Sequence, residues 1–314
     1  MTIGIAAFGP RAGRAALDGL AAAERIGRGA IGGFLSLAVL TPNGSLRRAE
    51  TQAGGTQGLH NLSEEILAAP VAALMSSASN RPEPLAQFVA GAAGVGLVTG
   101  HRFPNMPGRS GVPMNREVLD RMSAGIPPAA AVGAVVTANE EVDAGVVAID
   151  AQGRLGSADT RRLGRLMDRG SAKLGSQRSG GLVAVRHNGI RPARGLAWVV
   201  AEVALAVLRG GGEPHRWIKL CAGIPVVVSD ADRILVDGRG CATQLEVSGG
   251  TGVGTRHIGM GGGVPVCDNR ICLGFATYEP FLVVRDGVLV SIDGELECRV
   301  PVRSVQPQEH RGLS

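Results

Sequence analysis

Pairs of apolar segments joined by tight turns are the feature that most limits how this chain can fold. Four hairpins are predicted, at residues 33–55, 144–160, 223–238 and 280–302. The first turns at Pro42-Asn43-Gly44 and the second between Asp150 and Gly153, residue types typical of short turns. Because such turns join antiparallel strands, the hairpins exclude a purely parallel, doubly wound nucleotide-binding fold.

Helices rich in alanine and leucine are predicted before three of these hairpins, at residues 10–26, 115–125 and 191–212. Asn115 is a suitable N-cap and Gly125 a suitable stop for the second helix. The helix and its hairpin therefore form a unit that is expected to recur. The strands at 146–149 and 226–228 are apolar on both faces, which indicates that both sides of a sheet are covered.

These patterns predict an α+β fold, a four-layer αββα sandwich with antiparallel or mixed sheets. Aromatic residues make up only 3% of the sequence and there are 48 glycines, so small side chains must fill a core between closely spaced layers. We expect a single domain over residues 1–303, followed by a flexible tail at 304–314. A β-barrel covered by helices and a tandem of smaller α+β repeats are less economical alternatives.

Composition also limits the partners that are expected. The net charge is +5, but the arginines are scattered and stacking aromatics are scarce, so nucleic-acid binding is not expected. The five cysteines form no CxxC pair, and neither a disulfide framework, a metal site nor a cofactor is predicted. There is no basic leader and no run of 18 apolar residues, which favours a cytoplasmic homo-oligomer with no membrane contact.

The stretch GHRFPNMPGRSGVPMN, residues 100–115, interrupts the apolar pattern directly after a predicted buried strand at 93–100. A loop at a strand end is held by the sheet, and its prolines stiffen it further. We expect this loop to bind a small anionic molecule through four side chains, those of His101, Arg102, Asn105 and Arg109. In the alternative interpretation, the glycines and prolines only form the turns that the backbone needs here, and the polar side chains face water.

Glycine-rich segments at 54–56 (GGT) and 247–266 (VSGGTGVGTRHIGMGGGVPV) are a second candidate for the pocket wall. Closely spaced glycines allow backbone N–H groups to converge on an anion or an oxyanion. The candidate binding residues are Thr56, Ser248, Gly249, Gly250, Thr251, Arg256 and His257. The same glycines are equally consistent with bends where strands leave a sheet. Asp143, Asp150 and Asp159 are the acidic candidates around the second hairpin.

Residues 94–160 and the opening MTIGIAAFG resemble a group of uncharacterised bacterial proteins of the Ntn-hydrolase superfamily. The shared features are an Asn-Pro/Gly loop, a helix ending in Ala-Gly, and a strand reading apolar-Asp-x-x-Gly. AETQAGGT, at 49–56, is similar to the second strand of the isoaspartyl-peptidase branch, although Phe34 stands where that branch has its nucleophile.

The resemblance implies an αββα sandwich that hydrolyses amides through an N-terminal Thr, Ser or Cys whose own amine is the base. Thr2 is the candidate catalytic residue once Met1 is removed. The first hypothesis is therefore an Ntn-type amidohydrolase that acts on a small anionic amide. The second is a protein of the same fold without catalysis, a small-ligand binder or an oligomeric scaffold.

Overall fold

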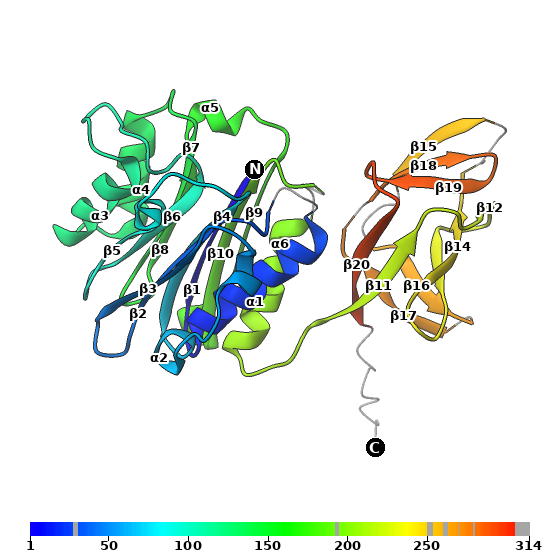
Figure 1. The fold of residues 1–314 in the computed structure, drawn as a ribbon, viewed down its shortest axis with the longest axis horizontal. Coiled ribbons are helices and arrows are strands. Elements are labelled where there is room, and N and C mark those ends of the chain that lie inside the picture. Colours follow the sequence, from blue (N-terminus) through cyan, green and yellow to red (C-terminus); the bar gives the residue numbers. More distant parts are fainter. Residues whose placement is uncertain are drawn as a thin grey trace, which may run out of the picture. The chain divides into compact units, whose positions relative to one another are not determined.

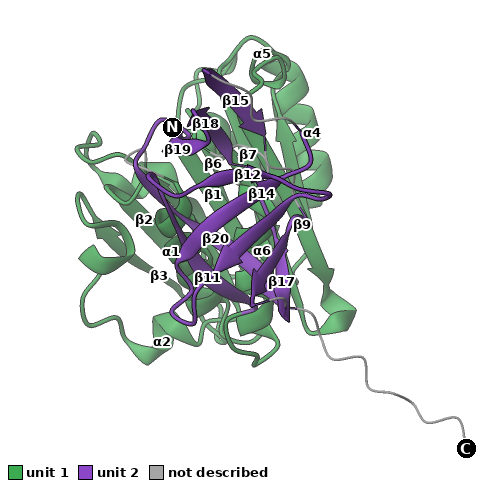
Figure 2. Cartoon of the chain, turned by 90° about the vertical axis from the view of Figure 1, so that its right-hand side faces the viewer, with its two compact units in different colours: residues 1–213 green, residues 214–314 purple. Residues whose placement is uncertain are grey.

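The computed structural model describes residues 1–27, 31–191, 195–249, 254–259, 263–269, 271–278 and 280–304. The chain divides into two compact units, Met1–Glu213 and Pro214–Ser314 (Figure 2), in place of the single domain predicted over 1–303. The predicted tail lies outside the described residues apart from Ser304, the last residue of a strand. No helix in the described ranges is long and apolar enough to cross a membrane.

The first unit contains two antiparallel sheets. The six-stranded sheet has the order β3-β2-β4-β1-β10-β9 and the four-stranded sheet the order β5-β6-β7-β8. The strands of the first sheet are β1 (Thr2–Phe8), β2 (Leu35–Leu40), β3 (Leu46–Thr51), β4 (Val71–Ser77), β9 (Arg169–Ser176) and β10 (Gly181–Asn188). Those of the second are β5 (Ala90–Ala92), β6 (Gly96–Arg102), β7 (Ala144–Asp150) and β8 (Leu155–Asp159).

Helices cover the outer face of each sheet in this unit. α1 (Ala12–Ile26) and α6 (Leu196–Leu208) pack on the six-stranded sheet, and α3 (Met114–Ser123) and α4 (Pro128–Ala138) pack on the four-stranded one. The inner faces of the two sheets contact each other through β1, β4, β6 and β7, as Figure 1 shows. The shorter helices are α2 (Glu64–Leu67), α5 (Arg161–Gly164), η1 (Gly55–Gly58), η2 (Leu85–Phe88) and η3 (Gln177–Ser179). The predicted α+β class is confirmed.

The core between the sheets is built from small and branched apolar side chains. Ala6, Leu97 and Val147 belong to one buried cluster, and alternation along β1 places Gly4 on the same face as Ala6. A Cβ atom at Gly4 would lie 2.4 Å from the carbonyl oxygen of Gly100 in the opposite sheet. The two sheets can approach this closely because Gly4 carries no side chain that would meet the backbone of Gly100.

Several local predictions are confirmed in this unit, and one is wrong. The first two predicted hairpins are the antiparallel pairs β2–β3 and β7–β8. Asn115, however, is not an N-cap, because α3 already begins at Met114. The Asn115 side chain is buried and donates from Nδ2 to the carbonyl oxygen of Gln87, 2.8 Å away. It therefore ties the helix to η2.

The second unit is built from strands in its described part. A seven-stranded sheet has the order β11-β20-β17-β16-β13-β14-β12, and a three-stranded sheet the order β15-β18-β19. The strands are β11 (His215–Cys221), β12 (Val226–Val228), β13 (Arg233–Val236), β14 (Ala242–Val247), β15 (Thr255–Gly259), β16 (Pro265–Asp268), β17 (Ile271–Ala276), β18 (Phe281–Arg285), β19 (Val288–Ile292) and β20 (Glu297–Ser304).

The predicted hairpin at 223–238 is wrong. β12 and β13 do not pair with each other but lie on either side of β14, with β12 parallel to it. Val228 is 58% exposed, so this strand is not covered on both faces as its apolar sequence suggested. The third helix–hairpin repeat also fails, because α6 belongs to the first unit and these strands to the second. The pair β18–β19 is antiparallel as predicted, whereas β20 pairs with β11 and β17.

Substituting Gly4 tests the close approach of the sheets. Because an added methyl group meets backbone rather than a movable side chain, Gly4→Ala is expected to lower the free energy of unfolding by about 1–3 kcal/mol. The control is Gly133→Ala in α4, where an added Cβ has open space and is expected to raise stability by about 0.5–1 kcal/mol. Urea denaturation measures both. Equal stability of Gly4→Ala and the wild type would contradict the observed packing.

Candidate functional site

A cavity of about 290 Å³ lies at the start of β1, and all of its lining residues belong to the first unit. Its apolar wall comprises Met1, Phe34, Met75, Pro82, Phe88, Phe103 and Met106. Its polar groups are Thr2, Arg81, Gln87, Arg102 and Asn105. A mainly apolar cavity with a few convergent polar groups is the usual form of a small-molecule site.

Thr2 opens β1, a central strand of the six-stranded sheet, and its side chain is held by two hydrogen bonds. The hydroxyl Oγ1 donates to Asn188 Oδ1 over 3.0 Å and accepts from the backbone N–H of Arg102 over 2.5 Å. Asn188 is the register partner of Thr2 in β10, and Arg102 ends β6 of the other sheet. The stacked sheets thus fix the orientation of the hydroxyl.

Arg102 adopts a left-handed backbone conformation, with φ at 62°. This region costs a non-glycine residue about 1–3 kcal/mol and is found at functional sites more often than elsewhere. The conformation accompanies the hydrogen bond from the Arg102 N–H to Thr2. The Arg102 side chain is ion-paired with Asp143, with Nε 2.9 Å from Oδ2.

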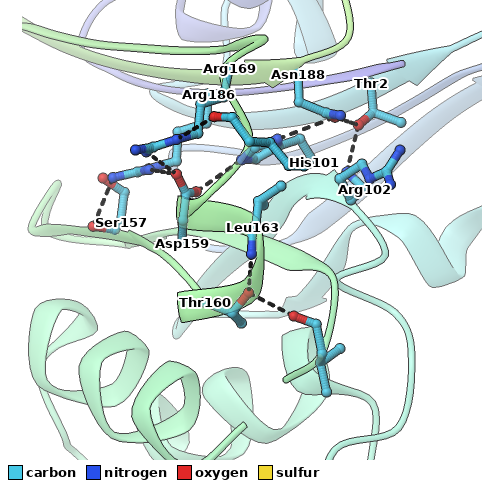
Figure 3. A network of polar contacts seen from close by, with 12 residues as sticks. Thr2, His101, Arg102, Ser157, Asp159, Thr160, Leu163, Arg169, Arg186 and Asn188 are labelled. Carbon is cyan, nitrogen blue, oxygen red and sulfur yellow. Dashed lines mark hydrogen bonds and ion pairs between the residues drawn. The ribbon is translucent and has the colours of Figure 1, made fainter. Parts of the chain in front are cut away.

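Behind Asn188, His101 and Asp159 extend the polar network (Figure 3). His101 Nδ1 lies 3.5 Å from Asn188 Oδ1, and Nε2 lies 2.9 Å from Asp159 Oδ1. Because an ionised carboxylate only accepts, the proton of this contact is on Nε2. A Cβ at Gly145 would lie 2.1 Å from His101 Nε2, so the absence of a side chain there makes room for the pair.

Asp159 is a buried carboxylate surrounded by positive groups. Its Oδ2 lies 2.7 Å from Arg186 Nη1 and 3.2 Å from Arg169 Nη1. Burial acts to raise the pKa of Asp159, but the hydrogen bond from His101 and the charge of Arg186 outweigh it and lower the pKa to about 2. The carboxylate is therefore ionised at neutral pH and orients the His101 ring.

Met1 occupies the cavity side of Thr2. Its carbonyl oxygen accepts from Ser77 Oγ over 2.8 Å. Burial lowers the pKa of its amino group, and the charges of Arg102 and Arg81 lower it further. The region at the start of β1 therefore favours a neutral amine, the form that can accept a proton.

The structure brings together four of the residues predicted from the 100–115 loop and the N-terminus. Thr2, Arg102 and Asn105 line the cavity, and the His101 side chain lies behind it, connected to Thr2 through Asn188. Asn105 donates from Nδ2 to Gln87 Oε1 over 2.8 Å. Arg109 does not line the cavity. Its side chain is exposed and its backbone N–H donates to Asn139 Oδ1.

Thr56 has a different role from the one predicted. Its backbone N–H donates to Glu24 Oε1 over 3.0 Å and its hydroxyl to Glu24 Oε2 over 2.5 Å. Burial raises the pKa of Glu24, and the two hydrogen bonds from Thr56 oppose this shift. Thr56 is absent from the lining of the cavity beside Thr2, and its contacts fix the Gly54-Gly55 turn to α1.

The residues predicted from the second glycine-rich segment do not line this cavity either. Ser248, Gly249, Arg256 and His257 belong to the second unit, and Gly250 and Thr251 lie outside the described residues. Ser248 Oγ donates to Asp232 Oδ1 over 2.9 Å. Arg256 and His257 lie in β15, where the His257 ring stands 5.2 Å from that of Phe281. Within the described ranges, no three potential metal ligands cluster.

Sequence reasoning missed Asn188, Arg186 and Arg81. The signal for the first two was the strand GLVAVRHN, in which alternation places Arg186 and Asn188 on one face and His187 on the other. His187 is fully buried, and neither ring nitrogen has a hydrogen-bond partner among the described residues. Arg81 follows β4 in a loop whose sequence, SNRPEP, gave no sign of a site.

The first unit is thus an α+β domain with a mainly apolar cavity at the start of one of its central strands. Residues 2–217 match the family described as a domain of unknown function (DUF6963), and the chain belongs to that family. Residues 223–297 match a second domain of unknown function (DUF7259). No curated protein matches the chain significantly. The boundary between the two matched regions lies close to the boundary between the two units.

The lowered pKa of Asp159 predicts acid sensitivity. Because the pKa of about 2 lies below the ordinary 3.8, the group stabilises the fold above about pH 4 and loses this contribution as the pH falls toward 2. The contribution is about 2 kcal/mol. Urea denaturation between pH 5 and 2 is expected to show this loss in the wild type and in the exposed control Asp120→Asn. Asp159→Asn is expected to show no such loss of stability. A pH slope in that variant equal to that of the wild type would contradict the ion-pair network around Asp159.

His187 predicts a second pH dependence at higher pH. Burial lowers its pKa from 6.5 to about 3, so below pH 6.5 the unfolded chain takes up a proton that the folded chain does not. Stability is therefore lost as the pH falls, by about 2 kcal/mol at pH 5. His187→Leu is expected to remove this loss between pH 7 and 5, as measured by urea denaturation. The exposed His60→Leu should keep the wild-type slope, and a similar effect of both variants would refute the assignment.

Proposed function

We propose that the first unit is an Ntn-hydrolase-like αββα sandwich that hydrolyses a small anionic amide, with Thr2 as the nucleophile after removal of Met1. The observation that carries this proposal is the position of Thr2. It opens a central strand at the wall of a cavity, with its hydroxyl fixed by Asn188 and by the N–H of Arg102.

The order of layers supports the fold assignment. α1 and α6 cover the six-stranded sheet, the four-stranded sheet packs on its inner face, and α3 and α4 cover the far side. Both sheets are antiparallel, as the hairpins in the sequence predicted. The resemblance of residues 94–160 to Ntn-hydrolase-like proteins implies the same arrangement.

The chemistry requires a free amine on Thr2. This amine takes the proton of Thr2 Oγ1 as the oxygen attacks the amide carbonyl, which gives a tetrahedral intermediate. The proton then passes to the leaving nitrogen, the C–N bond breaks, and an ester to Thr2 remains. Water hydrolyses this ester with the amine again as base. Burial, followed by the charges of Arg102 and Arg81, lowers the pKa of the Met1 amine, and the mechanism relies on the same effect at the amine of Thr2.

His101 and Asp159 are positioning residues in this mechanism. Asp159 orients His101, whose other ring nitrogen faces Asn188, and Asn188 accepts from the Thr2 hydroxyl. The charges of Arg81 and Arg102 at the cavity favour an anionic substrate.

One observation favours the second hypothesis, a non-catalytic small-ligand binder on the same fold. Met1 lines the cavity and its carbonyl is held by Ser77, so a chain that keeps Met1 has no free Thr2 amine. Such a protein binds ligand in the cavity without turnover. It gains stability by RT ln(1 + [L]/Kd) in a thermal-shift measurement. We also propose that the protein is a homo-oligomer, and its oligomeric state is to be measured on the same preparation.

Mass spectrometry of the N-terminus and an assay for released primary amine, with a panel of N-acyl amino acids, test the proposal. We expect the active protein to begin at Thr2. Thr2→Val is expected to lose at least about 1000-fold in kcat, because the nucleophile is gone, and Thr2→Ser to keep measurable turnover.

The control is Thr243→Val, an exposed threonine of the second unit, which should retain wild-type turnover. Full activity in protein that still carries Met1, or in Thr2→Val, would rule out this mechanism. Saturable binding without any turnover would instead support the second hypothesis.

A further inference from the structure

The two arginines at the cavity differ in how their charges are balanced. Arg102 is ion-paired with Asp143, and its guanidinium also stands 5.6 Å from the centre of the Phe103 ring. Arg81 has no carboxylate partner among the described residues. Within the described ranges its side chain donates only to Ser77 Oγ, from Nε over 3.2 Å and from Nη2.

We propose that Arg81 binds the carboxylate of the substrate while an apolar group of the same molecule packs on Phe34, Met75 and Phe88. The guanidinium has five N–H donors in a planar fork, and a carboxylate is the partner that this geometry fits best. The inference rests on the proposed function in that it places this carboxylate on the amide substrate.

The apolar wall is preformed. Phe34, Met75 and Phe88 are each at most 5% exposed, and the rings of Phe34 and Phe88 lie 4.7 Å apart in a tilted arrangement. Phe34 precedes β2, Met75 lies in β4 and Phe88 ends η2, so regular elements hold all three. The surrounding core therefore holds these three side chains in place behind the cavity.

These two features define a substrate class. One uncompensated cation matches one carboxylate, and the aromatic and thioether wall matches an aliphatic or aromatic side chain. The class is an amide that carries a single carboxylate beside a medium-sized apolar group, of which N-acyl derivatives of leucine or phenylalanine are the simplest examples. A neutral amide leaves Arg81 unpaired, and an acyl glycine leaves the wall empty.

Isothermal titration calorimetry on the full chain tests this with N-acetyl-L-leucine, N-acetyl-L-leucinamide and N-acetylglycine as probes. We expect N-acetyl-L-leucine to bind at least about tenfold more tightly than either of the others, the size of effect that loss of one charged hydrogen-bonded contact produces. Arg81→Met should remove the preference for leucine over leucinamide, and Arg81→Lys should keep part of it. The matched control Arg116→Met, an exposed arginine of α3, should keep all of it.

Equal binding of N-acetyl-L-leucine and its amide by the wild type, or no saturable binding of the acid, would overturn the inference even if a variant failed to fold. Retention of the preference in a folded Arg81→Met would do the same. The two proposals fail separately. Preference for the acid without turnover overturns only the hydrolase, whereas turnover of uncharged amides without a preference for the acid overturns only the carboxylate site.

Discussion

The close approach of β1 to β6 is the constraint on which the rest of the first unit depends. Gly4 faces the backbone of Gly100 with no side chain between them. Two residues before Gly4 and two residues after Gly100, the Thr2 hydroxyl accepts a hydrogen bond from the N–H of Arg102. The contact at the site is therefore a continuation of the packing in the core. A larger residue at Gly4 would separate the sheets, and the N–H of Arg102 would no longer reach the Thr2 hydroxyl.

A second constraint is electrostatic. Asp159 is a buried carboxylate, and its burial is tolerated because Arg186, Arg169 and His101 surround it. This charge lies at the end of β8, at the edge of the four-stranded sheet, while Arg186 and Arg169 come from the six-stranded sheet. The ion pairs thus join the two sheets at the end where the cavity lies, and they hold His101 in the direction of Asn188.

The hairpins at 33–55 and 144–160, the pair β18–β19, and the helices α1, α3 and α6 could be predicted because turn residues and apolar alternation act over a few neighbouring residues. Arg102 and Asn105 were predicted from a loop at a strand end and Thr2 from the resemblance, and all three line the cavity. The partners Asn188 and Arg81 could not be predicted, because only the sheet order brings β10 and the loop after β4 beside β1. The contact of Thr56 with Glu24 was not predicted either, because a Gly-Gly-Thr turn has the same sequence whether it faces a ligand or a carboxylate of α1.

Met1 decides between the two hypotheses for the cavity, an amide hydrolase and a non-catalytic ligand binder. Ser77 Oγ donates to the Met1 carbonyl and accepts from Arg81, so one hydroxyl connects the terminal residue to the proposed carboxylate-binding group. Cleavage after Met1 removes that carbonyl and the side chain that lines the cavity. In the proposed mechanism, the cleavage that frees the Thr2 amine to act as the base therefore also removes a side chain from the cavity that Arg81 lines. In a processed chain the proposed reaction and the proposed carboxylate binding would therefore share one cavity, whereas a chain that retains Met1 could only bind a ligand there.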